Sequence, residues 1–104
     1  MPTGMRGARP ARIRPDLGGR LSLWREAEEK VASLTTRELE VLALMAEGFT
    51  SHEIGATLGI SKRTVDIHRG TLLLKLDVKS GPLAVRVAVY AAFAQLDRDA
   101  HTSA

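Results

Sequence analysis

Two helix starts carry the same capping-box pattern, and this repeat constrains the fold more than any other feature of the sequence. Thr35 is followed by Glu38, and Thr50 by Glu53, each three residues on. In a capping box the hydroxyl accepts a hydrogen bond from the later amide, and the glutamate accepts one from the amide of the capping residue. The pattern predicts one helix that runs through Glu47 and a second that starts after Thr50.

Glycines and serines indicate the remaining helix ends. Gly48 and Gly59 can adopt the left-handed backbone conformation that ends a helix, so the second predicted helix is short. No long stretch alternates polar and apolar residues with the period of two that is typical of a β-strand, so we expect an all-α fold. Serine caps at Ser61 and Ser80 predict two longer helices, over residues 61–76 and 80–96.

The core of these four helices is predicted from apolar residues at helical spacing. In the first helix we expect the charged residues to point away from the core and a stripe of smaller apolar residues to face it. The positions expected to face the core are Leu39, Leu42, Ala43, Ala46, Ile54, Leu58, Val65, Leu72 and Leu76.

A short helix, a glycine turn and a longer helix make the outline of a helix-turn-helix. The crossing of its two helices needs a very small residue early in the first helix, and Gly55 is at that position. The turn four residues later needs a residue that tolerates positive φ, and Gly59 is there. Helix hairpins that do not bind DNA use similar turns, so the glycines alone are weak evidence for a helix-turn-helix. Together with the two capping boxes they are much stronger evidence.

The flanking segments differ from this domain in composition. Residues 1–20 hold five arginines against one aspartate and three of the four prolines, whereas residues 21–104 hold ten basic and eleven acidic side chains. We expect 1–20 to be a disordered basic tail, either an arm that touches phosphates or a linker, and 97–104 to be disordered as well. Residues 21–33 predict a short amphipathic linker helix whose Trp24 packs on the domain 34–96.

Catalysis and metal binding are not expected. The chain has no cysteine, no glycine-rich phosphate loop and no carboxylate cluster at ligand spacing. His68 is expected to be a packed core histidine, while His52 and His101 are far from it in sequence. We therefore predict a non-enzyme without cofactor or metal.

The run LTTRELEVLALMAEGFTSHEIGATLGISKRTVDIHRGTLLLKLDVKS closely resembles the DNA-binding domain of LuxR/NarL/FixJ-type bacterial transcription regulators. The resemblance covers residues 34 to about 93. It implies a four-helix domain whose third helix enters the major groove and whose fourth commonly forms a homodimer. Such regulators usually carry a receiver or ligand-sensing domain ahead of this one, so we expect either a stand-alone regulator or the C-terminal piece of a longer protein, with no small-molecule ligand in this chain.

The third helix is the predicted DNA reader. Burial of Val65 would turn the opposite face outward, and the resemblance implies that this face meets base edges. Asp66 could accept only from an exposed cytosine amino group, or could instead pair with Lys62 or Arg69 on the helix surface. The expected base-facing residues are Arg63, Asp66, Ile67 and Gly70.

Phosphate contacts are predicted from cations and from hydroxyls at helix starts. Residues 60–80 carry five cations against two aspartates, although Arg69 falls near the inward side by phase and is a candidate for packing instead. Free amides and hydroxyls at helix starts bind phosphate well. The expected phosphate contacts are Thr50, Ser51, Ser61, Lys62, Thr64, Arg69, Lys75 and Lys79.

The fourth helix is apolar on nearly every side, which implies a second contact beyond its own core. A membrane span is excluded by its length and by Arg86. We expect a homodimer interface around Val85, Ala88, Val89 and Ala92; the alternative is burial under the helix of residues 21–34.

Together these features predict a sequence-specific transcription regulator that binds double-stranded DNA as a homodimer through the helix 61–76. RNA polymerase is a further candidate partner, and the bacterial cytoplasm, at the nucleoid, is the expected location. The alternative is a helical interaction module, or a promoter-reading domain like that of a sigma factor, which uses the same fold to bind polymerase or another regulator.

Overall fold

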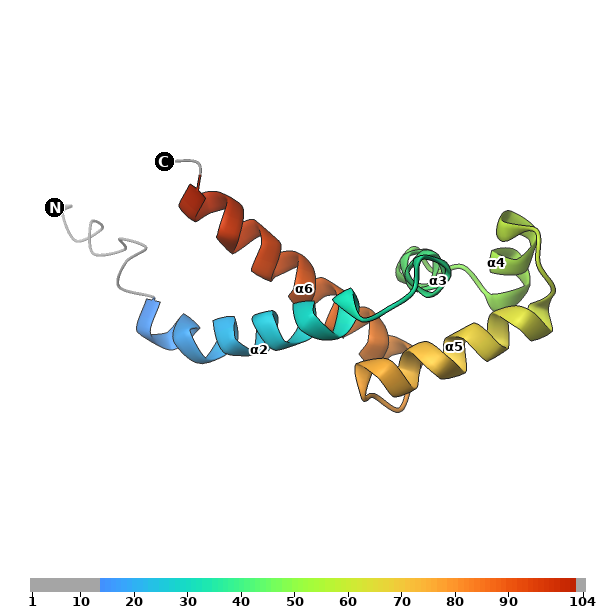
Figure 1. The fold of residues 1–104 in the computed structure, drawn as a ribbon, viewed down its shortest axis with the longest axis horizontal. Helices are drawn as coiled ribbons and strands as arrows, with labels where there is room; N and C mark the ends of the chain where they lie inside the picture. The colour runs from blue at the N-terminus through green and yellow to red at the C-terminus, as the bar shows by residue number, and fades with distance from the viewer. Residues whose placement is uncertain (1–13, 103–104) are drawn as a thin grey trace, which may run out of the picture.

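The computed structural model describes residues 14–102 of the 104-residue chain, with side chains from residue 19 to 101. These residues contain no strand, so the described part confirms the all-α class. The helices, labelled in Figure 1, are α2 (Arg14–Ala32), α3 (Thr36–Ala46), α4 (Ser51–Leu58), α5 (Lys62–Leu76) and α6 (Gly81–Thr102).

Both predicted capping boxes are present. The Glu38 amide donates to Thr35 Oγ1 at 3.1 Å, and the Thr35 amide donates to Glu38 Oε1 at 2.9 Å. The corresponding distances at the start of α4 are 3.1 and 2.8 Å. After α3 the backbone turns at Gly48 with φ +90°, and Gly59 ends α4 with φ +72°. These contacts confirm the predicted boundaries of α3 and α4.

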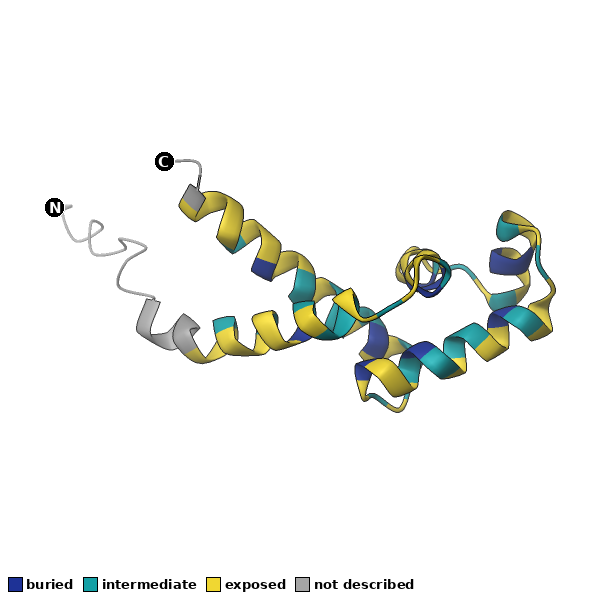
Figure 2. Ribbon diagram, viewed as in Figure 1, coloured by how far each residue is buried: buried dark blue, intermediate teal, exposed yellow. Residues whose placement is uncertain are grey.

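The main core lies where α3, α4, α5 and the first turns of α6 meet (Figure 2). Its largest fully buried side chains are Leu42, Ile54, Leu72, Leu76, Val41 and Val65. All three positions predicted to face inward on α5 are therefore confirmed. Leu58 of α4 is half-buried and packs against the same cluster.

The buried face of α3 differs from the prediction. The helix buries Glu38, Val41, Leu42 and Met45, whereas Leu39 is 46% exposed. The expected stripe was therefore wrong at Leu39 and also at Ala43 and Ala46, which are exposed as well. Glu38 can lie on the buried face because Lys75 Nζ donates to its carboxylate at 2.8 Å. Val41, Leu42 and Met45 follow it at helical spacing on the same face, so the buried stripe begins one residue earlier than predicted.

Helices α2 and α6 run antiparallel and extend to one side of the helix-turn-helix (Figure 1). The molecule is consequently elongated, with extents of 60 × 27 × 23 Å. The start of α2 corrects the expected boundary of the tail, because residues 14–20 are helical. Pro15 lies in the first turn, where a missing amide costs nothing. The rest of the predicted tail, residues 1–13, lies outside the described residues.

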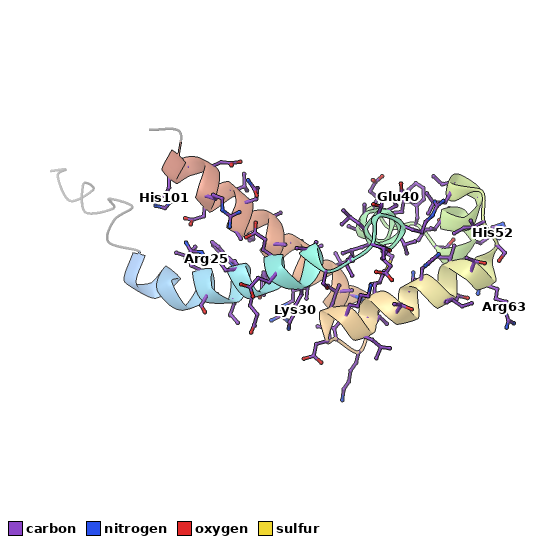
Figure 3. The ribbon with its side chains drawn as sticks, viewed as in Figure 1. Arg25, Lys30, Glu40, His52, Arg63 and His101 are labelled. Carbon is purple, nitrogen blue, oxygen red and sulfur yellow. The ribbon has the colours of Figure 1, made fainter. Side chains whose placement is uncertain are left out.

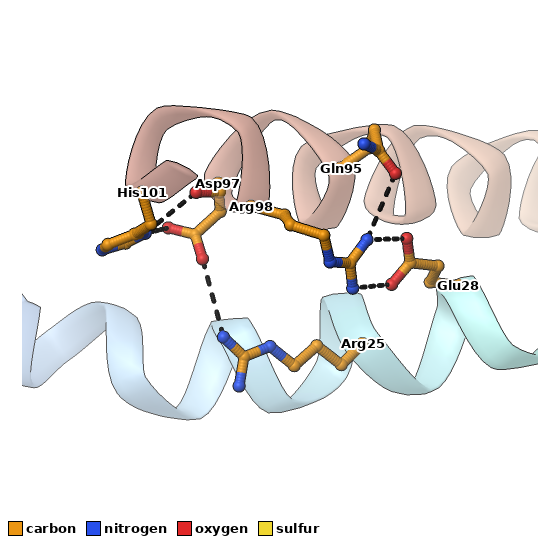
Figure 4. Close-up of polar contacts among 6 residues, drawn as sticks. All are labelled: Arg25, Glu28, Gln95, Asp97, Arg98 and His101. Carbon is orange, nitrogen blue, oxygen red and sulfur yellow. Dashed lines mark hydrogen bonds and ion pairs between the residues drawn. The ribbon is translucent and has the colours of Figure 1, made fainter. Parts of the chain in front are cut away.

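Ion pairs join the second half of α2 to the C-terminal part of α6 (Figure 4). Arg98 donates to both carboxylate oxygens of Glu28 at 2.6 Å, and Arg25 lies 3.6 Å from Asp97. These contacts explain why residues 97–102 continue α6 instead of being disordered as expected. Residues 103–104 lie outside the described part of the chain.

Candidate nucleic-acid interface

One face of α5 is exposed to solvent along its length. The predicted base-facing residues Arg63, Asp66, Ile67 and Gly70 are all exposed, and Ile67 is 58% exposed although it is apolar. A Cβ added at Gly70 would meet no atom within 4 Å, so nothing within the chain requires glycine there. Leu74, which the site prediction omitted, lies on the same face and is 82% exposed.

Hydroxyl groups gather where α4 and α5 begin. The Thr64 amide donates to Ser61 Oγ at 3.0 Å, and the two hydroxyl oxygens lie 2.9 Å apart. Thr50 caps α4 in the same way. Figure 3 shows His52 and Arg63 near these two helix starts, with Arg63 extending outward. The predicted phosphate contacts at the helix starts thus lie at one end of the molecule, next to the exposed face of α5.

Asp66 is held by a network within this end. Lys62 Nζ donates to Asp66 Oδ2 at 2.7 Å, with the two side chains 62% and 46% exposed. The ammonium of Lys62 first, and then a hydrogen bond from Ser51, lower the pKa of the Asp66 carboxyl from its ordinary value. The predicted alternative of a surface pair with Lys62 is therefore confirmed for the free chain.

The cations of the predicted phosphate set have different surroundings. Lys75 Nζ donates to the buried Glu38 carboxylate at 2.8 Å, which ties α5 to the start of α3. Arg69 is half-buried beside Gly81, where an added Cβ would come within 3.3 Å of its guanidinium. Lys79 is exposed, and the side chain of Lys62, although paired with Asp66, is 62% exposed against 34% for Lys75. Lys62 and Lys79 are therefore better placed than Lys75 and Arg69 to reach an outside phosphate.

The predicted dimer residues divide between two environments. Val85 and Ala88 are half-buried and pack against the core, whereas Val89, which is 43% exposed, and Ala92 face outward. Helix α2 packs along α6, with the rings of Trp24 and Phe93 5.1 Å apart, so the alternative of burial under this helix is realised in part. The prediction that Trp24 packs on the domain is confirmed.

The three histidines lie on three different helices. His68 is half-buried in α5, while His52 of α4 and His101 of α6 are exposed. Among residues 19–101, no three histidine, aspartate or glutamate side chains come together as metal ligands would. Within the described helices, none combines the length and apolar character that a membrane span needs.

Comparisons with known proteins agree with this geometry. Residues 32–88 match the family described as "Bacterial regulatory proteins, luxR family". The transcriptional regulatory protein FixJ of Azorhizobium caulinodans is 36% identical over 72 residues, which are 69% of this chain and 34% of that protein. The transcriptional regulatory protein LiaR of Bacillus subtilis is 51% identical over 59 residues, 57% of this chain and 26% of its own length.

A solved structure has the same arrangement of helices. The crystal structure of full-length FixJ from B. japonicum superimposes with a TM-score of 0.66 at 27% identity, over 86% of this chain and 41% of that one. The chain thus spans less than half of each of these three proteins. The family match covers α3, α4 and α5 with the first part of α6, which are the elements that build the exposed face. The chain belongs to the LuxR family of bacterial regulatory proteins, and residues 32–88 are its helix-turn-helix DNA-binding domain.

Proposed function

We propose that this chain regulates transcription by binding double-stranded DNA as a homodimer, with α5 in the major groove of each half-site. The observation that carries the proposal is the division of α5 into two faces. Val65, Leu72 and Leu76 are fully buried, while the opposite side is exposed from Arg63 to Leu74. A helix fits the major groove only if one of its sides is clear of its own domain, which is the case here.

Within this arrangement the side chains have separate roles. Ile67 is placed to contact a thymine methyl group, and Arg63 to contact a base edge or a neighbouring phosphate. Exposed Lys62 and Lys79 contact the phosphate backbone of the DNA. Such contacts fix the position of the protein on the duplex but do not read its sequence. Gly70 lets the helix approach the bases closely because it has no side chain.

The dimer interface is placed on the outer side of α6. Val85 and Ala88 are engaged by the core, so the contact shifts along the helix toward Val89 and Ala92. Leu96, at 61% exposed, continues this apolar strip beyond the residues that were predicted. A two-fold related copy would cover the strip and present two α5 helices to a palindromic site.

DNA binding is tested by titrating duplex DNA at several salt concentrations. Because phosphate contacts release counterions, affinity should fall as salt rises. Arg63→Ala and Lys79→Ala should weaken binding to every sequence, and each should reduce the salt slope by about 1 if it removes one phosphate contact. Ile67→Ala should instead change the preference between sites selected from random DNA. Salt-independent binding, or equal loss on all sequences from Ile67→Ala, would contradict the proposed contacts.

The dimer is tested by sedimentation of the chain at increasing concentration. Val89→Asp places a charge in the outer strip and should shift the protein toward monomer. Glu47→Asp, an exposed change just after α3, is the control. A wild-type chain that stays monomeric at the highest concentration, with and without a palindromic duplex, rules out the homodimer.

The rival interaction module makes a different prediction for α5. If the domain binds only protein, substitutions of Arg63 and Ile67 should change its affinity for the protein partner and leave its affinity for DNA unchanged. Comparing wild type, Arg63→Ala and Ile67→Ala on DNA and on purified RNA polymerase separates the two functions.

A further inference from the structure

The side chain of Asp66 engages a cation that the proposed function needs for DNA. It accepts a hydrogen bond from Lys62 Nζ at 2.7 Å. Lys62 is the first residue of α5 and a predicted phosphate contact. In the free chain, an internal carboxylate thus occupies the ammonium that a DNA phosphate would use.

Asp66 also faces outward on the side of α5 that is assigned to bases. Its side chain is 46% exposed, between exposed Arg63 and Gly70. A carboxylate near phosphates is repelled, and in the major groove it can be satisfied by the exocyclic amino group of cytosine. In the proposed complex, one side chain is therefore in reach of both the Lys62 ammonium and the base edges.

We propose that Asp66 is a specificity-determining residue that withholds Lys62 from DNA phosphates unless a cytosine amino group receives its carboxylate. This inference rests on the proposed binding of DNA by α5. On most sequences the phosphate backbone must compete with Asp66 for the Lys62 ammonium, and the displaced carboxylate has no new partner. Where a cytosine faces it, the carboxylate acquires a donor, and the phosphate contact of Lys62 forms together with the base contact.

An exposed ion pair suits this role because it is weak enough to open. Surface pairs of this kind contribute little to stability, so exchanging Lys62 between Asp66 and a phosphate carries a small cost. The effect on affinity should be correspondingly moderate, and it should show mainly on DNA without the preferred base. Asp66 thus lowers non-specific binding, which supplies no compensating base contact.

The test compares Asp66→Asn with Asp77→Asn. Both variants remove one negative charge from the stretch 60–80, and both positions are exposed, but Asp77 lies at the opposite end of α5. Asparagine tolerates the left-handed backbone at position 77, so the control keeps its fold. Binding is measured on a random-sequence duplex, on a site selected with wild-type protein, and on that site with its contacted cytosine replaced.

Asp66→Asn should bind the random duplex roughly three- to tenfold more tightly than wild type, with a salt slope steeper by about 0.9 for each additional phosphate that the protein neutralises. Asp77→Asn should tighten binding clearly less. On the selected site, wild type should prefer cytosine at the contacted position and Asp66→Asn should lose that preference. Equal tightening by both variants, or an Asp66→Asn variant that leaves random binding unchanged or weakens it, overturns the proposal.

A second measurement isolates the coupling between the two side chains. In a Lys62→Met background the carboxylate has no ammonium to withhold, so Asp66→Asn should improve random binding less than it does in the wild-type background. An undiminished improvement would show that Asp66 acts by charge repulsion alone and would overturn the withholding role.

Arg63→Ala separates failure of this inference from failure of the proposed function. If Arg63→Ala leaves DNA binding unchanged, α5 is not the DNA surface and both ideas fail. If Arg63→Ala weakens binding while Asp66→Asn behaves like Asp77→Asn, α5 still binds DNA and only the role of Asp66 is wrong.

Discussion

Gly55 lies where α4 crosses the start of α5, and the space there excludes any side chain. A Cβ at this position would come within 2.6 Å of the carbonyl oxygen of Ile60, a backbone atom that cannot move aside on its own. The amide of Ile60 also donates to the Gly55 carbonyl at 2.9 Å, so the two chain segments are already joined. Gly55→Ala should therefore destabilise the domain by about 1–3 kcal/mol, although alanine favours helix. Thermal unfolding followed by circular dichroism measures the change.

Gly70→Ala is the matched control for this variant. Gly70 also lies inside a helix, but an added Cβ meets nothing within 4 Å. Here only the helix preference of alanine acts, so Gly70→Ala should stabilise the domain by about 1 kcal/mol. Opposite signs for the two substitutions are expected, and a loss of stability at both positions would contradict the steric argument for Gly55.

Asp77 ends α5 in the left-handed conformation, with φ 58° and ψ 47°. It is the only non-glycine residue with positive φ among the described residues. An L side chain is strained in this region, and glycine is not. Asp77→Gly should raise the free energy of unfolding by about 0.5–1 kcal/mol, measured as a higher urea midpoint with an unchanged slope. Asp77→Ala, which keeps a Cβ, should not raise it.

The buried carboxylate of Glu38 links stability to acid pH. The hydrogen bond from Lys75 is the main cause that lowers its pKa below the ordinary value of 4.5, followed by the hydrogen bond from the Thr35 amide. Because the pKa is lower in the folded chain, the resulting stability is present above about pH 4.5 and is lost as pH falls through the folded-state pKa. The urea midpoint of the wild type should drop across this acid range.

Glu38→Gln tests that dependence directly. Glutamine can keep the capping hydrogen bond but not the charge that faces Lys75, so the variant should be less stable by about 1 kcal/mol near neutral pH. Its loss of stability on acidification should be smaller than that of the wild type. Glu53→Gln makes the same exchange in the exposed capping box of α4 and serves as the control. A steeper acid loss in Glu38→Gln than in the wild type would refute the assignment.

These residues show what local patterns can and cannot predict. The caps at Thr35 and Thr50 depend on groups three residues apart, so the sequence alone predicts them correctly. The pairing of Glu38 with Lys75 joins residues 37 apart, and no local pattern reports which lysine reaches which glutamate. Lys75 is a predicted DNA contact whose partner within the chain was missed for this reason.

At the scale of helices, the type of each element was easier to predict than its phase or its ends. The buried face of α5 was predicted from the helical spacing of Val65, Leu72 and Leu76, although apolar Ile67 and Leu74 lie on its exposed face. In α3 the observed stripe begins one residue earlier than the predicted one, because its buried face includes the charged Glu38. The extension of α6 to Thr102 depends on ion pairs with α2. These pairs cannot be predicted from the sequence of α6 alone.

At the scale of the whole molecule, α2 and the second half of α6 form an arm that stands apart from the proposed DNA-facing end (Figure 1). The arm has its own small interior, in which Ala27 and Ala94 are buried and Trp24 packs on Phe93. The family match includes neither the first turns of α2 nor the last turns of α6. The proposed DNA contacts and the packing of the arm therefore involve different residues and should respond separately to substitution.

Phe93→Ala tests this separation, with the single tryptophan of the chain as the reporter. Removing the ring takes away the aromatic partner of Trp24, which should shift its fluorescence toward that of an exposed indole. Because Phe93 is 41% exposed, the cost to stability should be about 1–2 kcal/mol, less than for a fully buried phenylalanine. Leu23→Ala, next to Trp24 but 52% exposed, should change the emission far less.

Affinity per protomer for non-specific DNA should stay at the wild-type value in both variants, since neither residue belongs to the α5 face. If Phe93→Ala weakens that binding as strongly as Arg63→Ala does, the arm and the DNA-facing end are coupled, and the separate roles given to them here are wrong.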